Sequence, residues 1–365
     1  MLTWIIGLVL VMVMIALGLP IAFSMAAIGF IGLTFIIGTD ASLALIGQVF
    51  FDNGMNYTLS ILPLFLLMGN FVVKAGLADE LYSAANAWLR HKKGGLAMAT
   101  IIACGGFSSV CGSSLATTAT MAKIALPSMK KYNYPDSLAT GVIAAGGTLG
   151  ILIPPSMILV LYGIITSQDI GQLFLAGLIP GLLGIIGYII AIKISILLNK
   201  KSFQTQTPLP FVKKVKSLKG VTGIILLFTI VMGGIYTGIF TTTEAAGVGA
   251  FGSLIIVMLK KKISIKSFYE ILIETVKVTS MLFFLLFGAI LFSNFINLAG
   301  LPNDLQNFLS IFNFNIYTLL IGIFIIYLIL GMFLESLSMM MLTVPIFYPL
   351  VQAMGGNLIW FGILV

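Results

Sequence analysis

Apolar segments long enough to cross a lipid bilayer follow one another along almost the whole chain, and they limit its possible folds more than any other feature. Of the 365 residues, 59% are hydrophobic and only 8% are charged, which excludes a soluble domain of this length. Because a backbone in lipid must satisfy its own polar groups, such spans form helices. The sequence therefore predicts an all-α polytopic membrane protein.

The charged and metal-binding residue types exclude several other classes. The 19 basic residues lie in short stretches between apolar spans, as in cytoplasmic loops, so the net charge of +8 does not indicate nucleic-acid binding. The single histidine lies in a basic flank and the two cysteines lie in one apolar segment, so neither zinc nor an organic cofactor is predicted. No Walker, zinc-protease or serine-nucleophile motif is present, which argues against an enzyme or an ATP-driven pump.

One apolar segment, 95–129, carries a run of small and hydroxyl residues at its middle and basic clusters at both ends, 90–93 and 130–131. Because basic clusters favour the cytoplasmic side, both ends are expected on that side. The segment is therefore predicted to be a re-entrant hairpin that turns at Gly112–Ser114. Backbone groups of a turn at membrane depth must be buried in protein or line a polar site, so functional residues are expected there.

Other segments complete a plan of spans, breaks and surface helices. In the span 137–165, the middle stretch 144–156 contains three glycines and the pair Pro154–Pro155, which predicts a broken helix. The polar stretch 200–219 is predicted to be a cytoplasmic linker. Amphipathic patterns at 79–90 and 264–277 predict helices on the membrane surface, the second followed by a separate span at 279–298. A second hairpin is predicted at 316–352, with its tip at 334–338.

The two halves of the chain resemble each other. Residues 75–81 match residues 299–305, and Ser114 precedes Pro127 by 13 residues, as Ser336 precedes Pro349. No lysine or arginine occurs from residue 278 to residue 365, as expected if the second hairpin opens to the outside. We therefore predict inverted-topology repeats at 1–199 and 220–365. The second is expected to be C-terminally incomplete, because the counterpart of the broken helix would lie beyond residue 365.

The hairpin tips and the broken helix supply the candidate cation ligands. Hydroxyl and carbonyl oxygens without thiolate or imidazole suit a hard cation such as Na⁺, although small and hydroxyl residues also occur where helices simply pack. Glu335 is an ionisable residue in an apolar segment and is predicted to ligate a cation or relay a proton; the alternative is a residue at the membrane interface. The predicted cation-binding residues are Gly112, Ser113, Ser114, Thr117, Gly146, Gly147, Thr148, Glu335 and Ser336.

An anionic substrate group is predicted beside these ligands. The unwound stretch Gly146–Pro155 would expose the N-terminus of a half-helix, and such a terminus favours a negative charge; the alternative is a simple proline kink. The predicted substrate-binding residues are Ser114, Thr118, Pro154, Pro155 and Ser338.

The chain resembles the large membrane subunit of tripartite ATP-independent periplasmic (TRAP) transporters over almost its whole length. The motifs that carry this resemblance are GSSLATTAT at 112–120 with Pro127, GGTLGILIPPS at 146–156, LIPG at 178–181, FTTTEAA at 240–246 and FLE at 333–335. The family's terminal Pro-Pro motif is absent, so its second cation site is expected to be only partly represented.

The resemblance implies a fold, a function and partners. The fold would be the elevator fold of the ion-transporter superfamily, with hairpins and broken helices in the moving part. The function would be Na⁺-coupled import of an organic acid, of the C4-dicarboxylate or sialic acid class, across the bacterial inner membrane. The implied partners are a small four-helix membrane subunit and a periplasmic substrate-binding protein. Two alternatives stay open: a stand-alone Na⁺/carboxylate transporter without a binding protein, and an ion channel.

Overall fold

The computed structural model describes residues 2–198, 205–305 and 315–365. Over these ranges the chain forms helices and no strand, as the sequence predicted. Five of the described helices are long and apolar enough to cross a membrane, and seven spans result if two bent pairs of helices each count as one. The prediction of a polytopic helical membrane protein is therefore confirmed.

The helices follow the predicted order of spans. The chain up to the predicted linker forms α1 (Leu2–Ala16), α2 (Ile21–Ile37), α3 (Thr39–Gly54), α4 (Ile61–Lys74), α5 (Leu77–Leu89), α6 (Gly95–Cys111), α7 (Ser114–Lys131), α8 (Asp136–Leu152), α9 (Met157–Thr166) and α10 (Ile170–Leu198). The remainder forms α11 (Phe211–Ser217), α12 (Thr222–Tyr236), α13 (Thr242–Leu259), α14 (Ile265–Leu298), α16 (Ile316–Leu330), α17 (Ser336–Ala353) and α18 (Leu358–Leu364). Short 3₁₀ turns occur at Tyr57–Ser60 and Leu218–Gly220.

One sequence expectation is contradicted by the structure, and the structure adds a detail to another. A surface helix at 264–277 was expected to be separate from a span at 279–298, and this is wrong, because α14 runs unbroken through both. No glycine or proline lies between residues 265 and 287, so nothing interrupts the backbone hydrogen bonds. The predicted linker 200–219, of which 200–204 lie outside the described residues, contains a helix. Pro210 lies at the N-cap of this helix, where its missing N–H is not needed.

The helices form two compact units, and each is made of separate stretches of the chain. One unit comprises residues 1–60, 161–169 and 277–365, and the other comprises residues 61–160 and 170–276. We call them the first and the second unit. This grouping reflects contacts and not sequence similarity, so the repeats at 1–199 and 220–365 stay a prediction.

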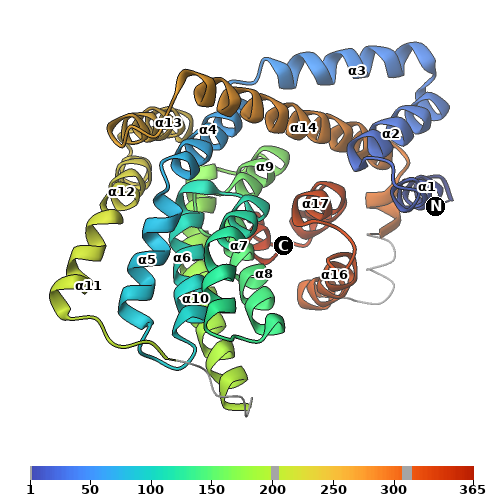
Figure 1. Cartoon of the computed structure of the whole chain (residues 1–365). Coiled ribbons are helices and arrows are strands. Elements are labelled where there is room, and N and C mark those ends of the chain that lie inside the picture. Colours follow the sequence, from blue (N-terminus) through green and yellow to red (C-terminus); the bar gives the residue numbers. More distant parts are fainter. Residues whose placement is uncertain (1, 199–204, 306–314) are drawn as a thin grey trace. The chain divides into compact units, whose positions relative to one another are not determined.

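Helix α6 is the core of the second unit. It lies among the helices of this unit (Figure 1) and packs against α4, α5, α7, α8, α10 and α12. Nearly all of its residues are buried. Small residues make these close contacts possible: a Cβ atom on Gly105 would lie 2.6 Å from the Ile185 side chain, and one on Gly146 would lie 2.6 Å from Cys104 Sγ. Both cysteines are buried and free, consistent with a packing role.

In the first unit, small residues again bring helices together. A Cβ atom on Gly29 of α2 would lie 2.8 Å from the backbone nitrogen of Phe292, and one on Gly288 would lie 2.5 Å from Ala22 O. The end of α9 is tied to α18, because Tyr162 Oη donates a hydrogen bond to Leu358 O at 2.5 Å. Tyr327 of α16 and Thr343 of α17 are joined through their hydroxyl groups.

Corresponding positions of the predicted repeats have similar backbone conformations. Gly76 and Gly300 both have positive φ, 72° and 88°. The carbonyl of each accepts a hydrogen bond from the N–H of the residue four positions later in the chain. Helices α7 and α17 each contain 18 residues, and each has a proline at its fourteenth position, Pro127 and Pro349. These similarities support the repeat prediction at the level of local structure.

Candidate functional site

The first predicted hairpin consists of two helices joined by a two-residue turn. Helix α6 ends at Cys111 and α7 begins at Ser114. Gly112 takes a left-handed conformation, with φ of 62°, and its N–H donates to Ser108 O at 3.1 Å. Ser113 caps α7, because its Oγ accepts a hydrogen bond from Ala116 N at 3.3 Å. The turn is therefore where the sequence predicted it.

The predicted broken helix is also present. Helix α8 ends at Leu152, α9 begins at Met157, and the two differ in direction by 41°. The break contains Pro154 and Pro155, joined by a cis peptide bond. Ser156 Oγ accepts from Leu159 N at 3.4 Å and caps α9, an apolar helix of ten residues. Prolines thus end one half-helix and a serine starts the other.

The hairpin turn lies directly against the break. Met157 N donates to Gly112 O at 3.3 Å, and a Cβ atom on Gly112 would lie 2.5 Å from Pro155 O. Glycine is therefore needed at residue 112 both for its φ and for the close carbonyl. A Cβ atom on Gly150 would similarly lie 2.9 Å from Ser113 O.

Four helix ends meet at this contact. Helices α6 and α8 end there, and helices α7 and α9 begin there. Figure 1 shows α6, α7 and α8 side by side. Carbonyl groups at helix C-termini carry partial negative charge, and N–H groups at N-termini carry partial positive charge. The junction therefore offers oxygen ligands for a cation and N–H donors for an anion within one unit.

Two buried hydroxyl groups near the turn add to its capacity for cations. Ser108 Oγ and Thr117 Oγ1 are inaccessible to solvent, and neither has a nitrogen or oxygen hydrogen-bond partner among the described residues; the neighbour of Thr117 Oγ1 is the weakly polar thiol of Cys111. A buried hydroxyl without a partner is destabilising, so native structures usually supply one. A hard cation prefers such oxygens. These two groups therefore fit the predicted Na⁺ site.

The remaining predicted residues of this unit lie around the junction in different ways. Gly147 lies against α7, since a Cβ atom there would be 1.8 Å from Thr118 Oγ1 and 3.2 Å from Ser114 O. Thr148 is exposed, and its Oγ1 donates to Ala145 O at 2.7 Å. Because this hydroxyl has only one proton, its oxygen is the acceptor of a second hydrogen bond, which Tyr188 Oη of α10 donates at 2.8 Å. The hydroxyl of Thr148 is thus engaged away from the turn, and its role as a cation ligand stays a prediction.

The second predicted tip belongs to the first unit. Glu335 is exposed and occupies the N-cap position of α17, after a turn that follows α16. Ser336 and Ser338 lie in the first turn of α17 and are partly buried. This arrangement places a carboxylate and two hydroxyls at one helix N-terminus, and their roles in cation and substrate binding stay predictions.

The structure adds residues that sequence reasoning did not select. Ser108, Gly150, Ser156 and Met157 all contribute to the junction or lie beside it. Ser156 had a readable signal, because a serine after prolines and before an apolar run marks a helix N-cap. Ser108 had none, since a serine on a helix one turn before a glycine is ordinary in sequence.

Comparisons with known proteins agree with this architecture. Residues 8–365 match the family model described as "Tripartite ATP-independent periplasmic transporter, DctM component". The chain is 33% identical to the C4-dicarboxylate TRAP transporter large permease protein DctM of Pseudomonas aeruginosa, over 91% of the chain and 78% of that protein. It is 32% identical to the sialic acid TRAP transporter large permease protein SiaM of Vibrio cholerae, over 95% of the chain and 81% of that protein.

A third relative carries a different substrate name. The chain is 29% identical to the isethionate TRAP transporter permease protein DctMQ of Oleidesulfovibrio alaskensis, over 96% of the chain and 55% of that protein. The three names agree on a TRAP permease and differ in the transported compound.

Proposed function

Because the chain belongs to the DctM component family of tripartite ATP-independent periplasmic transporters, we propose that it imports an organic acid across the bacterial inner membrane in symport with Na⁺. The observation that carries this proposal is the junction of four helix ends at Gly112, with its buried unpartnered hydroxyls. In this proposal the acid is of the C4-dicarboxylate or sialic acid class named in the relatives.

The chain's own residues would divide the work of binding. Carbonyl groups at the ends of α6 and α8, together with Thr117 Oγ1 and Ser108 Oγ, would replace the hydration shell of Na⁺. The positive charge of the bound Na⁺ and the N–H groups at the starts of α7 and α9 would attract the carboxylate of the substrate. An ion bound between turn and break would hold the two together, so that they move as one body in an elevator step.

The proposal includes two partners. In it, a small four-helix membrane subunit and a periplasmic substrate-binding protein assemble with this chain, in keeping with the word "tripartite" in the description of the family. The match to a relative named DctMQ, of which the chain covers only 55%, supports a membrane partner for this chain. The binding protein would select the acid and deliver it, and this chain would carry it through the membrane.

The function is tested by transport in proteoliposomes that contain the chain and its small subunit. Radiolabelled succinate or sialic acid, with the binding protein outside, should accumulate only under an inward Na⁺ gradient, and an equal K⁺ gradient should drive none. Uptake that persists without Na⁺ would overturn the coupling. Uptake by the chain alone would identify a stand-alone transporter, and a linear current without accumulation would identify a channel.

A second test measures Na⁺ binding without knowledge of the substrate. The purified chain should unfold at a higher temperature in NaCl than in KCl, because a ligand at ten times its Kd stabilises the folded state by about 1.4 kcal/mol. Thr117→Val should lose part of this Na⁺-dependent rise. In KCl the same variant should be at least as stable as the parent, because it removes a buried hydroxyl that lacks a partner.

The matched control is Thr100→Val, also in a buried position of the hairpin. Thr100 Oγ1 donates to Leu96 O at 2.9 Å, so this substitution should lower stability equally in both salts and keep the Na⁺ response. If Thr117→Val behaved like Thr100→Val, the hydroxyl of Thr117 would be a packing group only.

A further inference from the structure

A short basic helix directly precedes the apolar helix α12. Helix α11 and the 3₁₀ turn after it lead to α12 at an angle of 50°. The segment contains Lys213, Lys214, Lys216 and Lys219, and no acidic residue occurs between residues 205 and 220. A cluster of lysines at the end of a membrane span is typical of segments that meet the charged surface of a bilayer.

The same helix exposes apolar side chains. Phe211 and Val212 are 71% and 76% exposed, and Val215 and Leu218 are also exposed. Helix α5 lies beside α11 (Figure 1). The contact with α5 leaves these four apolar side chains exposed. A helix that exposes several apolar side chains between lysines is typical of helices that lie in a membrane interface.

The end of α5 adds an aromatic ring and more positive charge. The ring of Phe211 meets the ring of Trp88 edge to face, with centroids 6.3 Å apart, and Lys214 Nζ lies 5.9 Å from the centroid of Trp88. Tryptophan is enriched at the level of lipid headgroups. Lys92 and Lys93 follow α5 and are exposed. The linker is attached to the end of α5 by a hydrogen bond of 3.0 Å that Gln206 N donates to Arg90 O.

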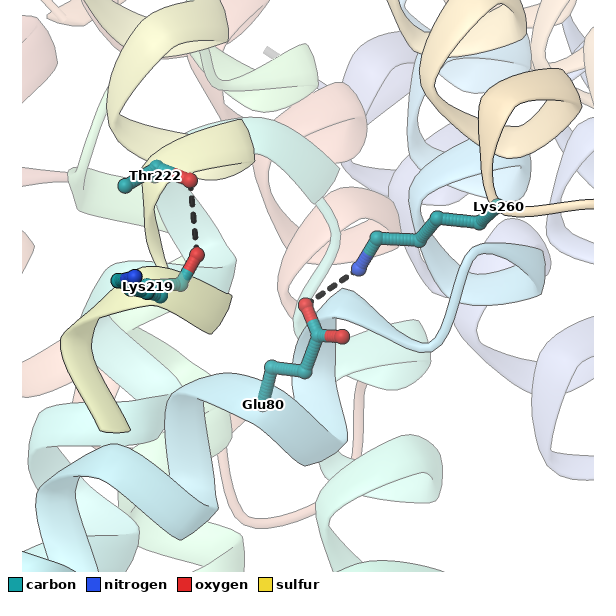
Figure 2. Close-up of polar contacts among 4 residues, drawn as sticks. All are labelled: Glu80, Lys219, Thr222 and Lys260. Atoms are coloured by element: carbon teal, nitrogen blue, oxygen red, sulfur yellow. Dashed lines mark hydrogen bonds and ion pairs between the residues drawn. The ribbon is translucent and has the colours of Figure 1, made fainter. Parts of the chain in front are cut away.

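The lysines of the α11 segment are not neutralised by carboxylates in the part of the chain that the structure describes. Among the residues that the structure describes, none of the four ammonium groups of the α11 segment forms an ion pair. The nearby carboxylate of Glu80 is already paired with Lys260, as Figure 2 shows. Figure 2 also shows Thr222 Oγ1 donating to Lys219 O, at 2.8 Å, which fixes the turn between the basic segment and α12.

We propose that α11 and the end of α5 form a binding surface for anionic phospholipid headgroups. The lysines contact the phosphates, while Phe211, Val212 and Trp88 enter the boundary between headgroups and acyl chains. In this proposal the lipids belong to the cytoplasmic leaflet, the side on which the basic loops are predicted to lie. Each lysine at such a surface strengthens binding to anionic lipid by up to about five-fold.

Trp88 provides a local reporter for this proposal. The chain has three tryptophans, and the double variant Trp4→Phe/Trp360→Phe leaves Trp88 as the only one. This variant is reconstituted in bilayers of phosphatidylcholine that contain either brominated phosphatidylglycerol or brominated phosphatidylcholine at equal mole fraction. Brominated chains quench a nearby tryptophan, so the brominated anionic lipid should quench Trp88 at least about two-fold more strongly, less so at high salt.

Charge substitutions complete the experiment. Changing the four lysines of the α11 segment to glutamine should remove most of the preference for the anionic lipid, because only Lys92 and Lys93 then remain at this surface. A control with the same loss of charge elsewhere should keep it; this control carries Lys130→Gln, Lys131→Gln, Lys193→Gln and Lys266→Gln. Thermal unfolding of both variants confirms that they are folded. Equal quenching by the two lipids in the parent, or a preference as large in the α11 variant as in the control variant, would overturn the proposal.

Discussion

Replacing Gly112 with alanine should abolish transport and lower the stability of the chain. An L-residue at φ of 62° costs about 1–2 kcal/mol, because its Cβ crowds the neighbouring carbonyl. The new Cβ would also lie 2.5 Å from Pro155 O, and a backbone carbonyl cannot swing aside as a flexible side chain does. Relief requires the turn to move away from the break, which separates the four helix ends.

The control for this prediction is Gly141→Ala in α8. A Cβ atom at residue 141 meets nothing within 4 Å, and alanine is preferred over glycine in a helix by about 1 kcal/mol. This variant should therefore match or exceed the parent in thermal unfolding and keep Na⁺-driven uptake. If Gly112→Ala kept both its stability and its uptake, the contact between turn and break would not be needed for function.

The second large effect is expected at Gly147, where α8 approaches α7. A Cβ atom there would lie 1.8 Å from Thr118 Oγ1 and 3.0 Å from Thr118 Cβ. Rotation of Thr118 relieves only the first of these contacts, so Gly147→Ala should cost about 1–3 kcal/mol, the usual range for overpacking. The measurement is the unfolding temperature of the purified chain in NaCl and in KCl.

A compensating change in Thr118 tests whether the cost arises at this contact. Gly147→Ala combined with Thr118→Gly removes the opposing side chain, so the double variant should be more stable than the sum of the two single changes. Thr118→Gly alone gives the cost of replacing threonine by glycine in α7, about 0.3 kcal/mol in helix propensity. Additive effects of the two substitutions would contradict the close approach of α7 and α8.

Much of the junction was predictable because its signals are local. Glycine and hydroxyl residues between basic flanks indicated the turn at Gly112–Ser114, and a Pro-Pro pair shortly after three glycines indicated the break. A single proline is a weaker signal, because Pro127 stays inside α7. The separation of 264–277 from 279–298 was wrong for a related reason. Polarity changes along α14, but no residue there interrupts its backbone hydrogen bonds, so the helix continues.

The sequence by itself determined the membrane-spanning class, the order of the helices and the positions of the turn and the break. These follow from hydropathy and from backbone chemistry, which act within a few residues. Only the tertiary structure decided that Gly112 O accepts from Met157 N, that Thr148 Oγ1 turns to Tyr188, and that the hydroxyl of Thr117 is buried without a partner. Such facts depend on which helix faces arrive side by side, and that is set by the packing of all the neighbouring helices at once.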